Sequence, residues 1–69
     1  EGLVIAAVKP GSAAEEAGLR SGDVITEINR QPIKNLTDYN RELTRNEKAK
    51  SVLLLVRRGQ SSLFLALKR

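Results

Sequence analysis

The residues of this chain that have catalytic side chains are few and do not form a catalytic set. The chain has no histidine and no cysteine, so it lacks the commonest general base and the most reactive thiol nucleophile. Ser12 therefore has no histidine to activate it, and no motif supports a Ser–Lys dyad. Asp23 follows a glycine directly before a predicted strand, where a carboxylate usually accepts backbone hydrogen bonds. We expect no catalytic residue, no cofactor and no metal.

The remaining acidic residues also have a structural explanation. Glu15 and Glu16 are adjacent, and they lie in the first turn of a predicted helix, where the helix dipole favours negative charge. No cluster of carboxylates occurs elsewhere in the sequence. Of the three functions considered, a binding and assembly module, a basic nucleic-acid- or membrane-binding domain and a small enzyme, the enzyme is therefore the least supported.

Length and charge limit the other classes of function. With 69 residues, the chain is one small domain or a piece of one. Its net charge of +4 requires a nucleic-acid interface to be considered. The basic residues are scattered among acidic ones, however, and Tyr39 and Phe64 are too few aromatics for a base-stacking platform. No apolar run approaches the roughly 20 residues of a membrane helix. We therefore predict no nucleic-acid partner and no membrane insertion; strong salt dependence of binding would indicate the basic-domain alternative.

Two apolar segments in the first half predict buried strands. Leu3–Val8 is a continuous apolar run, which favours a strand buried on both faces. In Val24–Ile28, strict alternation predicts that Ile25 faces one side of the sheet and Ile28 the other. A turn follows, and Ile33 is expected to anchor it to the core.

The C-terminal third predicts a strand hairpin. Ser51–Arg57 has an apolar centre, Ser62–Leu67 alternates, and Arg58–Gly59 is expected at the tight turn between them. The pair Arg57-Arg58 is interpreted as a solvated turn, with an assembly contact as the alternative. One face of the returning strand carries three leucines: Leu63, Leu65 and Leu67.

Both predicted helices begin with capping signals. Ser12–Ala17 starts with a serine and has Glu15 three residues later, which makes a capping box, and Gly18 fits the left-handed position that ends a helix. Asn35 is the expected N-cap of a second helix from Leu36 to about Arg45. The stripe that faces the core is thin, because one of the four residues at the i, i+3, i+4 and i+7 spacing is polar: Leu36, Tyr39, Asn40 and Leu43.

One segment is specific enough to indicate a family. Gly11–Ile25 reads GSAAEEAGLRSGDVI, which closely resembles the bacterial PDZ pattern G-S-P-A-x-x-A-G-L-x-x-G-D-x-I, with Ala13 in place of the usual proline. Asn29 falls four residues after Ile25, as in the family's I-x-x-x-N, and Ile33 occupies the usual apolar position. The resemblance covers nearly the whole chain.

Within this family, two further segments resemble one kind of parent protein. Ile33–Leu36 and Arg58–Leu65 are most similar to the second, C-terminal PDZ domain of HtrA (Deg)-type trypsin-like serine proteases, which degrade or hold misfolded proteins in the cell envelope. Site-two metalloproteases, C-terminal processing proteases and type II secretion components carry similar domains and are the alternative parents.

The resemblance implies a fold, a role and a location. Residues 1–69 would form a single PDZ domain of the α+β class, mainly β, with a partly open antiparallel barrel or sandwich capped by two helices. Such a domain is not itself an enzyme, although the parent chain would be a periplasmic or cell-envelope serine endopeptidase. Its expected partners are peptide or unfolded-protein segments and neighbouring domains or subunits of the parent.

The resemblance also implies where a ligand would bind. PDZ domains bind a peptide C-terminus as an added strand, between a groove strand and the longer helix. The residues that match this helix wall are Leu36, Tyr39, Asn40 and Leu43.

The strand on the other side of the groove is expected outside residues 1–69. In bacterial members the carboxylate-binding loop and groove strand lie further upstream, and Leu3–Val8 matches the core strand that follows them. We therefore expect an N-terminally truncated domain that binds C-terminal peptides weakly and exposes an unpaired sheet edge.

Overall fold

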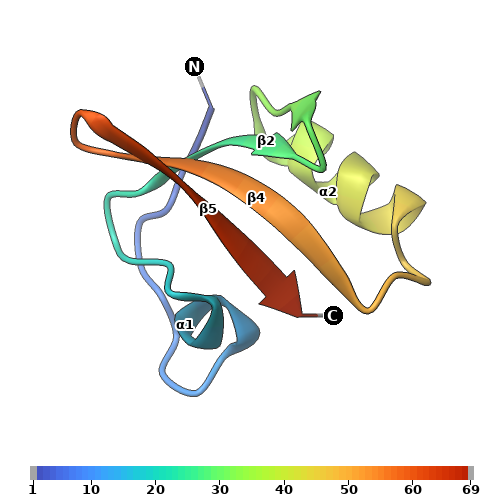
Figure 1. Cartoon of the computed structure of the whole chain (residues 1–69), viewed down its shortest axis with the longest axis horizontal. Helices are drawn as coiled ribbons and strands as arrows, with labels where there is room; N and C mark the ends of the chain where they lie inside the picture. The colour runs from blue at the N-terminus through green and yellow to red at the C-terminus, as the bar shows by residue number, and fades with distance from the viewer. Residues whose placement is uncertain (1, 69) are drawn as a thin grey trace.

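The computed structural model describes residues 2–68, which form an antiparallel sheet and two helices (Figure 1). This confirms the predicted α+β, mainly β fold class, with a sheet that stays open rather than closing into a barrel. The elements along the chain are β1 (Leu3–Val4), α1 (Ala13–Ala17), β2 (Val24–Ile28), β3 (Gln31–Pro32), α2 (Leu36–Arg45), β4 (Ser51–Arg58) and β5 (Ser61–Lys68).

The sheet is built around a long hairpin. Its strand order is β1-β2-β4-β5, and β3 pairs with β2 beside this path. β4 and β5 pair from Ser51↔Lys68 to Arg58↔Ser61, so the turn consists of Gly59 and Gln60. Gly59 has φ 62°, as a two-residue hairpin turn requires. The turn therefore lies one residue later than predicted, and Arg58 belongs to the strand.

The core lies on one face of this sheet. Ile33 is buried in it as predicted, and Leu63, Leu65 and Leu67 share the inner face of β5. The outer face of the hairpin carries exposed Leu53 and Phe64. The buried apolar residues are Leu19, Ile25, Ile28, Ile33, Val52, Leu54, Val56 and Leu67.

The first predicted strand is wrong in length and burial. Only Leu3–Val4 forms β1, and Val4, Ala6 and Ala7 are exposed. Ile5 extends the contact with the next strand, because its N–H donates to the Asp23 carbonyl. Beyond this point the neighbouring chain turns away at Ser21–Gly22, so the rest of the apolar run has no strand to pair with.

The alternation predicted for β2 is also wrong. Ile25 and Ile28 are both fully buried, although they are an odd number of residues apart. The register shows the reason: Ile25 pairs with Val56 and Glu27 with Leu55, which leaves Thr26 as an extra residue. This β-bulge turns Ile28 back to the core face.

The two helices begin as predicted, and in the view of Figure 1 the β4–β5 hairpin passes between them. Both contribute side chains that pack against the same core. In α1, the Ser12 hydroxyl accepts a hydrogen bond from the Glu15 N–H, and the Glu15 carboxylate accepts one from the Gly11 N–H. Gly18 then ends the helix in the left-handed conformation, with φ 98°. The following residue, Leu19, is buried in the core.

Candidate functional site

The predicted groove helix, α2, is defined by the same kind of cap as α1. The Asn35 Oδ1 accepts a hydrogen bond from the Asp38 N–H at 2.9 Å, and the Asp38 carboxylate accepts one from the Lys34 N–H at 3.0 Å. Arg41 pairs with Asp38 on the exposed surface at 3.2 Å. Local hydrogen bonds thus define the first turn of α2.

The four residues predicted to line the groove fall into two pairs. Tyr39 and Leu43 are half-buried and pack against the core, so they hold the helix on the sheet. Leu36 is 57% exposed, and Asn40 is exposed as well. The structure thus places Tyr39 at the edge of the core.

The C-terminal end of α2 carries polar contacts that the sequence analysis did not identify. Asn46 follows the helix, and its Nδ2 donates to the Glu42 carbonyl at 2.7 Å. Its Oδ1 accepts a hydrogen bond from Asn29 Nδ2 at 3.1 Å. The Glu42 side chain is largely buried and receives Arg45 Nη1 at 3.3 Å. Asn29 had drawn attention only as a family motif residue.

The edge of the sheet at β1 is open. β1 pairs with β2, and within residues 2–68 no strand pairs with its other edge. Val4, in this strand, is 64% exposed. Unpaired N–H and C=O groups along a strand edge are the surface on which an added strand forms hydrogen bonds.

Comparison with known proteins identifies the family. The sequence matches the PDZ domain family over residues 4–58. The chain belongs to this family. It therefore has the predicted role of a protein-interaction module rather than a catalytic domain.

The relatives of this PDZ domain include periplasmic proteases. It is 42% identical over 69 residues to a probable periplasmic serine endoprotease DegP-like of Brucella suis, covering 97% of this chain and 14% of the relative. It is 38% identical over 65 residues to the periplasmic serine endoprotease DegP of Salmonella typhimurium, covering 94% and 13%. The domain thus spans about one seventh of the length of these curated relatives, whose names support the predicted periplasmic location.

A solved structure has the same fold. The HtrA3 PDZ domain bound to a phage-derived ligand, FGRWV, superimposes with a TM-score of 0.77 and 27% sequence identity. The match covers 94% of this chain and 56% of that chain.

Asp23, a carboxylate whose pKa is lowered in the folded domain, has a structural role. Asp23 is 1% exposed and receives Arg58 Nε at 2.9 Å and Arg58 Nη2 at 2.8 Å, in a bidentate pair. It also accepts the Arg20 N–H, and Arg58 Nη2 donates to the Gly18 carbonyl. The Arg58 hydrogen bonds hold the pKa of Asp23 below its usual value despite burial.

This pair changes the interpretation of the arginines before the hairpin turn. Arg58 was predicted to lie in a solvated turn, and this prediction is wrong, because it belongs to β4 and pairs with Asp23. The alternative, an assembly contact, stays a prediction. Its side chain reaches back to Asp23 because register places Arg58 at the end of β4, beside the start of β2. Arg57 is exposed, as expected.

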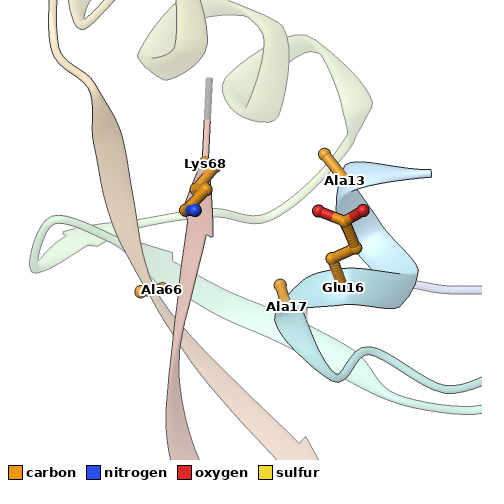
Figure 2. Close-up of a pocket in the computed structure, with 5 residues that line it drawn as sticks. All are labelled: Ala13, Glu16, Ala17, Ala66 and Lys68. Carbon is orange, nitrogen blue, oxygen red and sulfur yellow. The ribbon is translucent and has the colours of Figure 1, made fainter. Parts of the chain in front are cut away.

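A small pocket lies between α1 and β5 (Figure 2). Its volume of about 150 Å³ is below the roughly 300–1,000 Å³ of small-molecule sites. We assign no ligand to it. Its lining residues are Ala13, Glu16, Ala17, Ala66 and Lys68.

Two further features, a metal-binding cluster and a membrane-spanning helix, are absent from the described part of the chain. Between residues 2 and 68, no three acidic, histidine or cysteine side chains come together in a way that would hold a metal ion. No helix in this range has the length and apolar character needed to cross a membrane.

Proposed function

We propose that this PDZ domain is the peptide-recognition and assembly module of a periplasmic serine protease, and that α2 forms one wall of its groove. The ligand is an extended segment of an unfolded protein or its C-terminus. The module resembles the second PDZ domain of such proteases and serves to recruit substrate and to contact neighbouring domains or subunits.

The observation that carries this proposal is the exposure of Leu36. An apolar side chain left 57% exposed in the first turn of a helix has free surface for a ligand side chain. Asn40, one turn later, is exposed and has a side chain that can donate and accept hydrogen bonds. Tyr39 and Leu43 contribute by holding these two residues in place from the core side.

The open edge of β1 supports the second half of the groove. An upstream strand of the chain added at this edge would pair with β1 through the main chain, in the same way that a bound peptide pairs with a sheet edge in β-augmentation. By family resemblance this strand and the carboxylate-binding loop lie upstream of Glu1. The groove is therefore expected to be complete only in a longer form of the chain.

The relatives suggest a peptide with which to test binding and a class of parent protein for this domain. The HtrA3 PDZ domain is bound to the ligand FGRWV, so a peptide of this sequence with a free carboxylate is a reasonable first ligand. The serine endoproteases to which the chain is 38–42% identical support a protease as its parent.

The test is an NMR titration of two forms of the protein with the FGRWV peptide. One form is residues 1–69, and the other is extended upstream by one loop and one strand of the parent chain. We expect amide shifts at residues 36–43 in the extended form, and much smaller shifts in the shorter form. If neither form responds to FGRWV or to a library of C-terminal peptides, the peptide-recognition role is wrong.

A pair of leucine variants locates the site. In the extended form, Leu36→Ser removes the exposed apolar side chain from α2, and we expect the dissociation constant to rise about tenfold, equivalent to about 1.4 kcal/mol. Leu53→Ser is the matched control, because Leu53 is an exposed leucine on the outer face of the hairpin. Equal losses in both variants would place the ligand elsewhere.

A further inference from the structure

The second helix is held on the domain by few apolar contacts. Only Tyr39 and Leu43 of α2 pack against the core, and both are half-buried. The most buried residue of this helix is Glu42, a charged residue, rather than an aliphatic one. Since apolar packing usually provides most of the stability of a protein helix, other contacts must help to fix where α2 lies.

A short path of hydrogen bonds connects the end of α2 to the central strand β4. Asn46 Oδ1 accepts from Asn29 Nδ2 at 3.1 Å. The Asn29 Oδ1 accepts from the Leu53 N–H at 2.8 Å, and the Asn29 N–H donates to the Leu53 carbonyl at 2.7 Å. Two side-chain amides thus join the last turn of the helix to the backbone of β4.

Both asparagines are suited to these places. Asn29 has φ 49°, in the two-residue turn between β2 and β3, and asparagine tolerates this left-handed conformation better than most residues. Its short side chain can use both its oxygen and its nitrogen while the turn points it at β4. Asn46, at the helix C-cap, binds the helix through Nδ2 and the turn through Oδ1.

The other end of α2 is attached differently. Ile33 is buried in the core three residues before the helix begins, and Asn35 and Asp38 cap the first turn locally. These contacts fix the start of the helix but leave its tilt relative to the sheet undetermined. At the distal end, the Asn29–Asn46 bridge adds a polar attachment to the packing of Leu43 against the core.

We propose that Asn29 and Asn46 are positioning residues that set the C-terminal end of α2, and with it the width of the peptide groove. The inference rests on the proposed function of α2 as a groove wall. Neither asparagine touches the ligand in this arrangement. They act through the orientation of Leu36 and Asn40, the two exposed residues of the wall.

Two substitutions at one position separate positioning from stability. Asn46→Ala removes both side-chain hydrogen bonds, whereas Asn46→Asp keeps an oxygen that accepts from Asn29 Nδ2. The aspartate loses the bond to the Glu42 carbonyl and puts a negative charge at a helix C-terminus, so both variants should melt at lower temperature than the unchanged protein. Only the alanine variant loses the bridge.

In the extended form, we expect the two variants to differ in peptide affinity although both have a lower melting temperature. Asn46→Ala should weaken FGRWV binding about threefold to tenfold, the range expected for one lost hydrogen bond. Asn46→Asp should bind within about twofold of the unchanged protein despite its lower melting temperature. If affinity follows melting temperature in both variants, the positioning role is wrong.

A variant at the start of the helix provides the matched control. Asn35→Ala removes the N-cap and should lower the melting temperature, yet it leaves the Asn29–Asn46 bridge in place. Its affinity for FGRWV should therefore fall less than that of Asn46→Ala. The reverse order would contradict the proposal.

A measurement without ligand keeps this inference separate from the proposed function. Residual dipolar couplings of the amides at residues 36–45 report the orientation of α2 relative to the sheet in the free protein. They should change in Asn46→Ala and not in Asn46→Asp. Unchanged couplings in Asn46→Ala overturn the positioning role, whereas absence of peptide binding by the unchanged protein, with the couplings shifting as expected, overturns only the groove function.

Discussion

The two helices of this domain start alike and are held in place by different means. In each, the N-cap side chain accepts a hydrogen bond from the third helical residue, and an acidic side chain reaches back to the N–H before the cap. α1 then ends at Gly18, whose carbonyl binds Arg58, and Leu19 enters the core directly afterwards. α2 instead ends at Asn46, whose amide bridges to Asn29.

This difference separates a structural helix from a binding one. α1 lies beside an ion pair whose carboxylate, that of Asp23, is buried, and beside the buried Leu19, so its position is closely coupled to the stability of the domain. α2 has an exposed leucine, a buried glutamate and a polar attachment, features that cost stability in a helix with only a structural role. The helix assigned to the groove thus combines an exposed leucine with a buried glutamate, whereas α1 has no buried residue of its own.

Removal of Arg58 should give the largest loss of stability, and the contacts that it removes lie beside α1. Arg58→Ala leaves the Asp23 carboxylate buried without its partner, which is strongly unfavourable. We expect the melting temperature to fall on the order of 10 °C. Arg57→Ala is the matched control, since this neighbouring arginine is exposed, and circular dichroism melts of both variants make the comparison. Similar small losses in both would show that the pair contributes little.

The next largest effect should be a loss of stability in acid, which also arises at the Asp23–Arg58 pair. The pKa of Asp23 is lowered in the folded state, so its contribution to stability is complete above its ordinary value of 3.8 and is lost as pH falls through the lowered pKa. Urea unfolding from pH 7 to pH 2.5 should therefore show a loss of stability below about pH 4. Arg58→Ala should reduce this loss, because it removes the main cause of the lowered pKa. An equally steep acid limb in that variant would assign the loss to other carboxylates.

Removal of either helix N-cap should give the smallest losses of stability, and the two losses should be similar. Ser12→Ala and Asn35→Ala each remove one side-chain hydrogen bond at a helix start, and each should lower the free energy of unfolding by about 1 kcal/mol. Hydrogen exchange should then distinguish them. The local protection loss should be confined to α2 in Asn35→Ala, whereas in Ser12→Ala it should extend to the Arg58 contacts. Identical protection patterns would remove the distinction between the two helices.

Local signals in the sequence were sufficient to predict both helices. The caps at Ser12 and Asn35 and the glycine after Ala17 depend on neighbours within four residues, so pattern and structure agree there. Long-range register was the main source of error. The extra residue Thr26 depends on how β2 meets β4, and nothing within Val24–Ile28 signals it.

The site was predicted only in part for the same reason. Helical spacing identified Leu36, Tyr39, Asn40 and Leu43 as one face but did not divide them into core and exposed pairs, which depends on where the sheet lies. The Asp23–Arg58 pair joins residues 35 positions apart, and the Asn29–Asn46 bridge joins residues 17 apart. Neither contact has a periodic signal, because each joins residues from elements that are distant in the sequence.

The bulge at Thr26 bears on how this strand tolerates changes in length. Ile25 pairs with Val56, Glu27 with Leu55 and Ile28 with Leu54, so the partner residues on β4 are consecutive while Thr26 stands outside the ladder. Deletion of Thr26 would leave a regular strand with both isoleucines still facing the core. A single-residue gap, normally disruptive inside a central strand, is thus neutral for side-chain orientation at this one place. A related domain that lacks this one residue can therefore keep the same inner and outer faces of the sheet.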